Sequence, residues 1–461
     1  LTLQGVIAEL DGKTYELDLA SEYSANVFIN GSFEILSVDF VDGTGAPAYW
    51  RFSNEKIYVR IKVRNSSGYE ITKVDIHCAG EGLDGGYFSI LQDEIIKQSD
   101  DTYIVEYNYH NETKQRDIIN KLEVHYENQY VSDTSAFGNG DTFAFFAYFE
   151  EEDVHYISNA EQLMNIGSYG YYELTSDIDL SGVEWENRDF GGVLNGNGYA
   201  IKNISLTGDV GSDSANPTEI GFFRVLSGIA YDLSFENAFI MITGKNIRFA
   251  LLAANNYGSI VNCSIDDSSV ISVSGAGMIG GFVGDNYGLI QGGVNNASIS
   301  GNGATSAGIA PFNMDAGRIV DCINNGDIVN NNGEVGGISC HNSGTVTGCV
   351  NNGNVTNSNY DACGIVLGNA GSIRRCTNNG RIVSEGQGSA YGISSNNTGD
   401  ISDCINNGLL DGYHRTAGIV DYNFSIITNC FNTADTSGGC GIANEGNGGI
   451  IKDCVSVGCV E

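Results

Sequence analysis

The chain has 461 residues, including 62 Gly and only 3 Pro, and its 57 acidic side chains outnumber its 22 basic ones to give a net charge of −35. This charge argues against nucleic acid and anionic lipid as partners, because both need a basic surface. The 24 Tyr and 20 Phe argue against disorder, Gly without a three-residue period excludes collagen, and no apolar run approaches the ~18 residues of a membrane-spanning helix.

Residues 1–153 alternate between apolar and polar side chains, as half-buried strands do. The alternation is clear at residues 57–63, 103–109 and 143–149. We therefore predict an antiparallel β-sandwich of about seven to nine strands. The runs Ala48-Tyr49-Trp50 and Phe145-Phe146-Ala147-Tyr148-Phe149 resemble fimbrillin-like lipoprotein domains of gut Bacteroidetes, and this resemblance implies an exported lipoprotein.

The acidic run at residues 150–153 marks the predicted boundary to a second domain, residues 154–461. The first part of that domain, residues 154–220, is expected to act as a capping segment. Ser158 followed by Glu161 is a helix start signal, so a short helix should cover the open end of the second domain.

A cluster of carboxylates around one aromatic residue lies in the capping segment, and its members are Asp177, Asp179, Glu184, Trp185, Glu186 and Asp189. Paired carboxylates beside an aromatic ring are what a glycosidase or a sugar site uses. Three interpretations stay open: acid–base catalysis with Trp185 as a ligand platform, Ca²⁺ binding at Asp177 and Asp179, and a structural role. A structural role or Ca²⁺ is favoured over catalysis, because Asp177 and Asp179 alternate along a strand with apolar residues.

A repeat dominates residues 221–461. A segment that ends in Cys, followed by Asn-Asn-Gly or a close variant, recurs with steps of 24 to 30 residues, and Gly293 fills the Cys position once. The other positions hold Cys263, Cys322, Cys349, Cys376, Cys404, Cys430 and Cys454. A Gly-Ile pair recurs in phase with them, at Ile309, Ile338, Ile365, Ile393, Ile419 and Ile442.

Each repeat holds three short β-prone pieces separated by Gly and Asn turns. Such short pieces cannot bury a face alone, so successive repeats must stack. Long helices are excluded by the density of Gly and Asn. A hairpin arrangement would not bring one residue type to the same position of every unit, whereas a coil does so. The sequence therefore predicts a right-handed parallel β-helix of roughly eleven coils, about 50 Å long.

The run Gly280-Gly281-Phe282-Val283-Gly284-Asp285-Asn286-Tyr287-Gly288-Leu289-Ile290 resembles the GLUG repeat of bacterial surface proteins. Residues 251–260 are a looser copy, and residues 156–163, 172–180 and 194–199 resemble the first segments of such β-helices. The resemblance covers roughly residues 154–461. It implies an exported or surface-attached bacterial protein, often an adhesin or a module beside a catalytic domain, and it implies no reaction.

The repeated cysteines are expected to form a reduced structural ladder, because a small apolar thiol suits a tight inward position. No Cys-x-x-Cys pair favours a metal site. The neighbouring asparagines, such as Asn324-Asn325 and Asn351-Asn352, are expected to stack along the rod, with a sugar-binding row as the alternative.

Most of the sequence motifs that would indicate an enzyme are absent. The His-Glu-x-x-His motif of zinc peptidases that carry GLUG repeats is absent, and so is the Gly-His-Gly motif of β-helical hydrolases that resemble polygalacturonases. Arg60-Ile61-Lys62 matches a second hydrolase motif but lies in the predicted sandwich. An anionic rod would also repel uronate polymers.

The sequence as a whole favours a non-enzymatic, monomeric bacterial surface or secreted protein, adhesin-like, that binds glycans or host and matrix components. A carbohydrate-active hydrolase or lyase and a purely structural stalk are the alternatives. No cofactor is expected other than Ca²⁺. The expected location is extracellular, with a lipid anchor supplied by a segment outside this chain.

Overall fold

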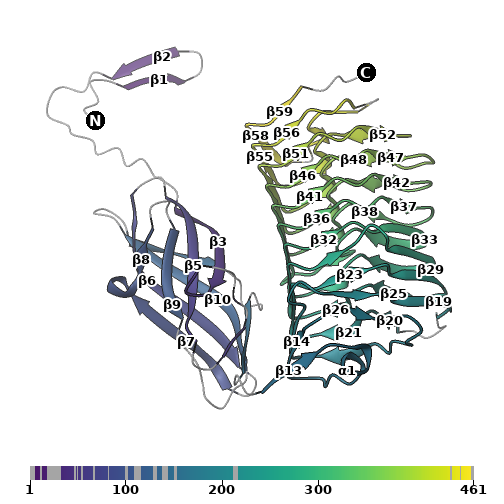
Figure 1. Ribbon diagram of the computed structural model, residues 1–461. Helices are drawn as coiled ribbons and strands as arrows, with labels where there is room; N and C mark the ends of the chain where they lie inside the picture. The colour runs from purple at the N-terminus through teal and green to yellow at the C-terminus, as the bar shows by residue number, and fades with distance from the viewer. Residues whose placement is uncertain are drawn as a thin grey trace.

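The computed structural model describes residues 6–10, 13–17 and 33–457, apart from gaps at residues 46–47, 49, 53–54, 66–67, 81–82, 99–101, 108–115, 128–131, 138–143, 150–152, 211–215, 437–438 and 447. The fold is nearly all β, with 57% of residues in strands and 3% in helices (Figure 1). Antiparallel sheets form the N-terminal part and a parallel β-solenoid forms the C-terminal part, so the predicted fold class is confirmed.

The N-terminal part is a β-sandwich of two sheets. The six-stranded sheet contains β4 (Trp50–Phe52), β12 (Ala144–Phe149), β10 (Arg116–Glu127), β6 (Glu70–Gly80) and β7 (Leu83–Leu91), with β11 (Ser132–Phe137) paired to β10. The four-stranded sheet contains β3 (Phe33–Val41), β5 (Ile57–Asn65), β9 (Thr102–Tyr107) and β8 (Ile96–Lys97), and a short 3-10 helix, η1 (Gln92–Glu94), precedes β8. A separate hairpin joins β1 (Val6–Leu10) to β2 (Lys13–Leu17).

The predicted alternation produces the sandwich core. In β5 the side chains of Ile57, Val59, Ile61 and Val63 are buried and those between them are more exposed. Tyr103, Val105 and Tyr107 of β9 are buried in the same cluster. The predicted alternation at Tyr109 and at residues 143–149 lies outside the described side chains.

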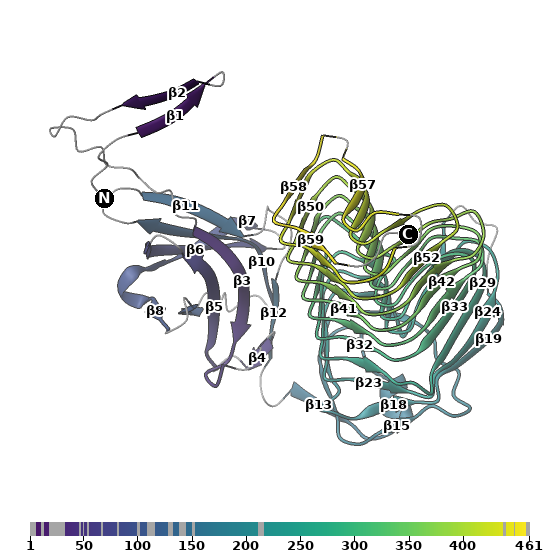
Figure 2. The ribbon, with the colours of Figure 1, turned by 90° about the horizontal axis from the view of Figure 1, so that it is seen from above.

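The solenoid has four parallel sheets, here called sheets A to D. Each regular coil passes through sheet D, sheet A and sheet B, then twice through sheet C, before it returns to sheet D one level higher. Seen along the rod, the outline of the coils is notched between sheet D, which includes β57, and sheet C, which includes β52 (Figure 2).

The strands of sheets A and B are two to four residues long. Sheet A contains β13 (Val154–Ile157), β14 (Tyr171–Leu174), β17 (Val193–Asn195), β22 (Ile229–Tyr231), β27 (Ser259–Val261), β31 (Leu289–Gln291), β35 (Arg318–Val320), β40 (Thr345–Thr347), β45 (Ser372–Arg374), β50 (Asp400–Ser402), β55 (Ile426–Thr428) and β58 (Ile450–Lys452). Sheet B contains β15 (Ile178–Asp179), β18 (Ala200–Lys202), β23 (Ser234–Glu236), β28 (Ser264–Ile265), β32 (Val294–Asn295), β36 (Ile323–Asn324), β41 (Val350–Asn351), β46 (Thr377–Asn378), β51 (Ile405–Asn406), β56 (Phe431–Asn432) and β59 (Val455–Ser456).

Sheets C and D form the side of the rod that carries the notch. Sheet C contains β19 (Ser205–Asp209), β20 (Thr218–Ile220), β24 (Phe239–Thr243), β25 (Ile247–Ala250), β29 (Val270–Gly280), β33 (Ser298–Ala307), β37 (Ile328–Asn330), β38 (Val335–Gly336), β42 (Val355–Asn357), β43 (Ala362–Cys363), β47 (Ile382–Ser384), β48 (Ala390–Tyr391), β52 (Leu410–Gly412) and β53 (Thr416–Ala417). Sheet D contains β16 (Arg188–Phe190), β21 (Phe223–Leu226), β26 (Ala253–Asn256), β30 (Val283–Asn286), β34 (Phe312–Asn313), β39 (Ser339–Asn342), β44 (Val366–Asn369), β49 (Ser394–Asn397), β54 (Val420–Asn423) and β57 (Ala443–Glu445).

A short helix, α1 (Ala160–Met164), lies at the first end of the rod, where the sequence predicts one (Figure 1). Its N-cap is Asn159, whose side chain accepts a hydrogen bond from the Gln162 backbone, and not Ser158 as the sequence suggests. Ser158 instead donates its backbone N–H and hydroxyl to the Gln162 side chain. The capping arrangement is therefore displaced by one residue along the chain.

Each cysteine of the repeat follows a residue in the left-handed backbone conformation, with φ between 50° and 56° for the non-glycine residues. These residues are Asn262, Asp321, Arg375, Asp403, Asn429 and Asp453, and Gly292 and Gly348 take the same place in other coils. Asn, Asp and Gly tolerate this conformation best, which explains why one of them precedes the repeated position in every coil except that of Cys376, where Arg375 does.

Two ladders of buried Asn side chains run along the rod. In each ladder the side-chain amide of one coil donates to the side-chain oxygen of the next coil at 2.7–2.9 Å. The first ladder contains Asn256, Asn286, Asn313, Asn342, Asn369, Asn397 and Asn423, and the second contains Asn295, Asn324, Asn351, Asn378, Asn406 and Asn432. The asparagines thus satisfy buried polar groups between coils. The sequence predicts this stacking for the second ladder, whose residues follow the repeated cysteines, and not for the first.

Candidate functional site

The carboxylates of Asp177 and Asp179, the predicted pair in the capping segment, already bond other side chains of the protein. Asp177 accepts from the Lys202 ammonium at 2.8 Å and from the Ala200 backbone, and Lys202 also bonds Glu236 at 2.8 Å. Asp179 accepts from Ser181 and from the Asn203 side chain, and these hydrogen bonds lower its pKa to about 2. A Ca²⁺ ion bridging Asp177 and Asp179 would have to compete with the Lys202 ammonium.

The remaining members of that cluster point in different directions. The Trp185 ring stacks on Phe222 with centroids 4.1 Å apart, and its indole N–H donates to the Phe222 carbonyl at 2.8 Å. Asp189 pairs with Arg224, while Glu184 and Glu186 are exposed. Trp185 therefore packs within the rod, and its ring face toward Phe222 is closed to a ligand.

The repeated cysteines line the interior of the rod. Cys263, Cys322, Cys349, Cys376 and Cys404 are fully buried and Cys454, at the last coil, is only partly buried. All ten cysteines that the structure describes in detail are free thiols. Loss of hydration raises the pKa of Cys263 to about 12, so its thiol stays protonated and unreactive at neutral pH.

A more extensive arrangement of polar side chains lies in the notch between sheets C and D, here called the inner corner. One row stands on the second strand of each coil in sheet C or, in the upper coils, on the residue directly before that strand. It contains Glu219, Arg248, Met278, Thr305, Glu334, Asp361, Ser389 and Arg415. The facing row stands on sheet D and contains Asn255, Asp285, Phe312, His341, Gly368, Asn396, Tyr422 and Glu445. Side chains of the two rows bond across the corner.

The lower part of the inner corner is a closed ion-pair network. The Arg248 guanidinium bonds Glu219, Asn255 and Asp285 at 2.8–2.9 Å. Asp285 is 2% exposed, and its second oxygen is buried without a hydrogen-bond partner among the described residues. Burial raises the pKa of Asp285, whereas Arg248 opposes that change.

The middle of the inner corner combines an aromatic stack with an empty position. Phe312 and His341 stack with centroids 4.8 Å apart, and His341 Nε2 lies 2.6 Å from a Glu334 carboxylate oxygen. The next position of that row is Gly368, which has no side chain opposite Asp361. The floor beneath is the small apolar cluster of Cys363, Leu367, Tyr391 and Ala417, which is separate from the main core.

The upper part of the inner corner is built around Arg415. Its guanidinium bonds Glu445 at 2.9 Å and the Tyr422 hydroxyl at 3.1 Å. Beneath it, Asp421 is 1% exposed and accepts from the Tyr391 hydroxyl at 3.0 Å and from Asn444. The floor is therefore buried, while the rim side chains His341, Glu334, Arg415 and Glu445 keep between 40% and 46% of their surface exposed.

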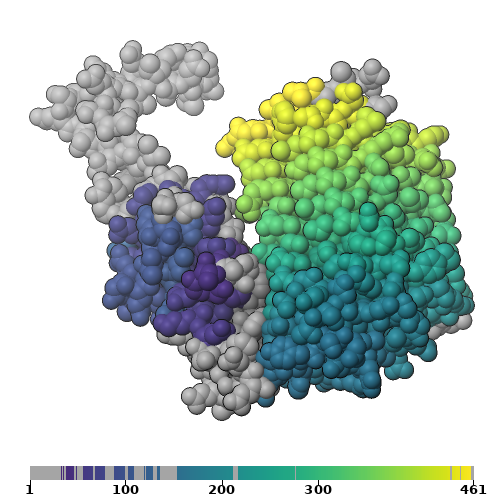
Figure 3. All heavy atoms as spheres, viewed as in Figure 1, coloured from purple at the N-terminus to yellow at the C-terminus, as the bar shows by residue number. Residues whose placement is uncertain are grey.

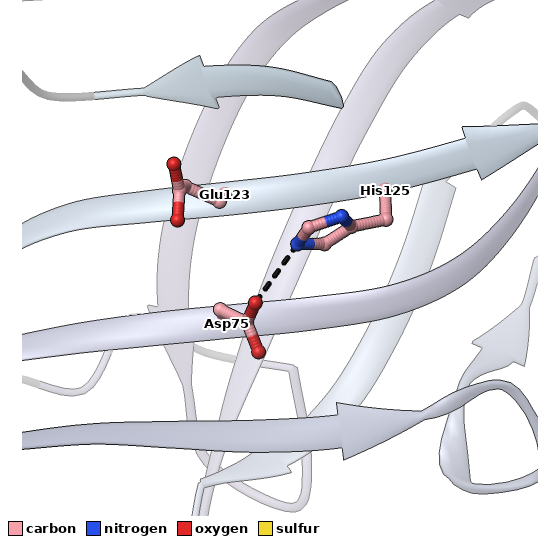
Figure 4. Close-up of side chains that lie close together, drawn as sticks. All are labelled: Asp75, Glu123 and His125. Carbon is pink, nitrogen blue, oxygen red and sulfur yellow. Dashed lines mark hydrogen bonds and ion pairs between the residues drawn. The ribbon is translucent and has the colours of Figure 1, made fainter. Parts of the chain in front are cut away.

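The sandwich carries a separate cluster of Asp75, Glu123 and His125 whose ligand atoms lie close enough to surround a metal ion (Figure 4). His125 Nε2 lies 2.8 Å from Asp75, but Lys73 also bonds Asp75 at 2.6 Å and Lys121 bonds Glu123 at 2.6 Å. Two ammonium groups already neutralise these carboxylates. The arrangement therefore fits a surface ion-pair network better than a metal site.

Sequence reasoning did not find the inner corner, because successive residues of each row are about 27 positions apart and only Asn255 and Asp285 share a motif, the GLUG-like run. Their common signal is their place in the repeat: the Glu334, Asp361 and Arg415 row follows the same turn in successive coils. The candidate carboxylates of the capping segment lie elsewhere, apart from Asp189, whose partner Arg224 also bonds Glu219 of the corner.

Comparison with known proteins finds only a partial similarity. No family model matches it. It is 31% identical over 153 residues to a protein of Evansella cellulosilytica that is provisionally named a Gly-rich membrane protein, a match that takes in 29% of this chain and 16% of that protein. The chain thus spans about one sixth of the length of the curated relative that it matches. The GLUG and fimbrillin-like resemblances stay predictions.

Among the described residues, no helix is both long enough and apolar enough to cross a lipid bilayer. The parallel β-solenoid fits surface and secreted proteins in general.

Proposed function

We propose that this protein is a non-enzymatic, adhesin-like protein of a bacterial surface or of the extracellular space, and that its inner corner binds an extended glycan. The observation that carries the proposal is the double row along the corner, from Asn255 to Glu445, in which aromatic, amide and charged side chains predominate. Successive positions repeat at about 4.8 Å, the spacing of parallel strands. A linear chain of sugars can make the same kind of contact at several levels of such a surface.

The chemistry of the middle and upper corner suits a sugar. The Phe312 and Tyr422 rings are partly exposed, and the parts that His341 and Arg415 leave uncovered offer apolar surface to the C–H side of a sugar ring. Asn396 and Arg415, which are both exposed, supply hydrogen-bonding groups at neighbouring levels. Because the chain carries a net charge of −35, a neutral glycan is favoured over a polyuronate.

We expect Gly368→Phe to lower glycan affinity by at least about tenfold, or 1.4 kcal/mol. The new ring would fill the empty position opposite Asp361, and Phe312 shows that this row accepts Phe two coils earlier. The backbone of Gly368 lies outside the left-handed region, and an added Cβ would meet His341 Nδ1 only at 3.4 Å. A glycan array followed by calorimetry on the strongest ligand measures the effect.

The matched control is Val329→Phe, which adds a ring at an exposed position of β37, away from the inner corner. It should leave the affinity unchanged. Loss of binding in both variants would contradict the placement of the site. The absence of saturable binding of the unchanged protein to any glycan or matrix protein would favour the structural stalk.

One observation favours a carbohydrate hydrolase as a second candidate function. Glu334 and Asp361 precede the paired residues Val335 and Ala362, so they occupy the same position of successive coils. The hydrogen bond from His341 lowers the pKa of Glu334, whereas burial raises the pKa of Asp361. Two neighbouring carboxyl groups whose pKa values are shifted in opposite directions are the kind of pair that glycoside hydrolysis uses.

If this second function holds, the protein should release new reducing ends from a polysaccharide, and Asp361→Asn should reduce that rate by a factor of about 100 or more. Asp411→Asn, on the exposed strand β52, should leave the rate unchanged. Cleavage that survives Asp361→Asn would place catalysis elsewhere. No cleavage of any polysaccharide by the unchanged protein would contradict the hydrolase and leave the binding proposal standing.

A further inference from the structure

The outer surface of sheet A changes character along the rod. From the first coils upward, the first residue of each strand is Tyr171, Val193, Ile229, Ser259, Leu289, Arg318, Thr345, Ser372 and then Asp400. The lower half of this row is mostly apolar and the upper half is polar. Along each strand, the residue of this row is followed by one that faces the main core, such as Leu194 or Ile260. The residues of the row therefore point away from the main core.

The apolar half of this row is nevertheless buried. Val193 and Ile229 are 0% exposed, and Leu289 is 6% exposed. Together with Tyr171 and Val261 they form a cluster separate from the main core, and burial raises the pKa of Tyr171 to about 12. Higher up, Arg318, Thr345 and Ser372 are only partly buried and Asp400 is exposed. Another part of the molecule must cover the lower half.

The β-sandwich lies on this side of the rod. Both ribbon views place it beside sheet A, and the space-filling view shows the upper coils rising beyond it (Figures 1, 2 and 3). The pKa of Asp321, in the turn after β35, is raised by loss of hydration first and also by the Asp39 carboxylate of β3. Asp39 of the sandwich therefore lies near the level where the row turns polar.

We infer that the β-sandwich is docked firmly on the apolar lower half of sheet A, formed by Tyr171, Val193, Ile229, Val261 and Leu289, and that the two domains move as one body. Domains joined in one chain move relative to each other by default unless a large apolar interface holds them. Buried apolar residues that face outward supply such an interface. The docked sandwich leaves the inner corner free, since the rim of the corner stays exposed.

The test is small-angle X-ray scattering of the full chain carrying Ile229→Arg and Leu289→Arg together. Arg318 already occupies the same position of β35, so Arg at this position is compatible with a coil of the rod. We expect the double variant to show a larger radius of gyration and a larger maximum dimension than the unchanged protein, with the thermal unfolding of the rod retained. Thr345→Arg, at the same position two coils above Leu289, should leave the scattering curve unchanged.

A second variant guards against loss of folding. Ser259→Arg removes no apolar contact but places a charge at a position that is 2% exposed, between Ile229 and Leu289. It should extend the molecule in the same direction. The inference is overturned if both variants scatter like the unchanged protein, or if the unchanged protein already scatters as two independently moving domains.

Discussion

Asn351→Asp is expected to destabilise the rod by about 3 kcal/mol or more, although it changes only one side-chain atom. The Asn351 amide donates to Asn378 at 2.9 Å and to the Gly353 carbonyl at 2.9 Å, and its oxygen accepts from Asn324 at 2.8 Å. An aspartate oxygen in place of the amide nitrogen would face two acceptors in a site that is 0% exposed. The loss is measured as a fall in the urea concentration at the midpoint of unfolding, which circular dichroism monitors.

The matched control for this change is Asn352→Asp, on the adjacent exposed residue. Asn352 takes part in an outer ladder with Asn325 and Asn379, and water can solvate a charge there. This control should change stability by less than about 1 kcal/mol. Equal losses in the two variants would show that the buried ladder is not what holds the coils in register.

The loss in Asn351→Asp should also depend on pH in a defined direction. Burial among acceptors raises the folded-state pKa of the new carboxyl group above its unfolded value of about 3.9. Stability relative to the unchanged protein is therefore best below that unfolded value, where the protonated group can still donate one hydrogen bond. It falls as the pH rises toward the folded pKa. A variant whose deficit grows on acidification would contradict the assignment.

The repeat made most of the rod predictable. A Cys or Gly at one position, a left-handed Asn, Asp or Gly before it and a stacking Asn after it are all consequences of one coil geometry, so their spacing indicated the fold directly. The N-cap of α1 was misplaced by one residue because Ser158 and Asn159 are both good caps, and only the hydrogen bond from the Gln162 backbone N–H to the Asn159 side chain decides between them.

The inner corner could not be predicted in the same way. Its rows come from the angle at which sheets C and D meet, and short β-prone pieces do not specify that angle. The residues that face one another, such as Glu334 and His341, are close in sequence but belong to two strands. Tyr391 and Asp421 come from different coils altogether. The sequence pattern around Trp185 made Asp177 and Asp179 candidates for Ca²⁺ binding or a structural role, and the structure pairs them with Lys202 and Asn203.

Two glycine substitutions are expected to change stability in opposite directions. Gly326 lies where an added Cβ would come within 1.9 Å of the Ala297 carbonyl oxygen in the coil below. Carbon and oxygen normally stay about 3.3 Å apart or more, and the neighbouring backbone cannot retreat without loosening the parallel ladders on either side. Gly326→Ala should therefore cost more than about 3 kcal/mol.

Gly293→Ala should instead stabilise the rod by about 0.4–1 kcal/mol, because the backbone there is not left-handed and alanine lowers the entropy of the unfolded chain. A Cβ at Gly293 would meet Cys322, Ile290 and Phe282 at 3.5 Å, which is ordinary contact, at the one position of the cysteine ladder that lacks a side chain. Urea midpoints of the two variants should fall on opposite sides of that of the unchanged protein. If both midpoints fall below that of the unchanged protein, the cysteine ladder has no room for a side chain at Gly293, and packing requires glycine there. If Gly326→Ala does not lower the midpoint, the coils are less tightly stacked than the contacts of Gly326 require.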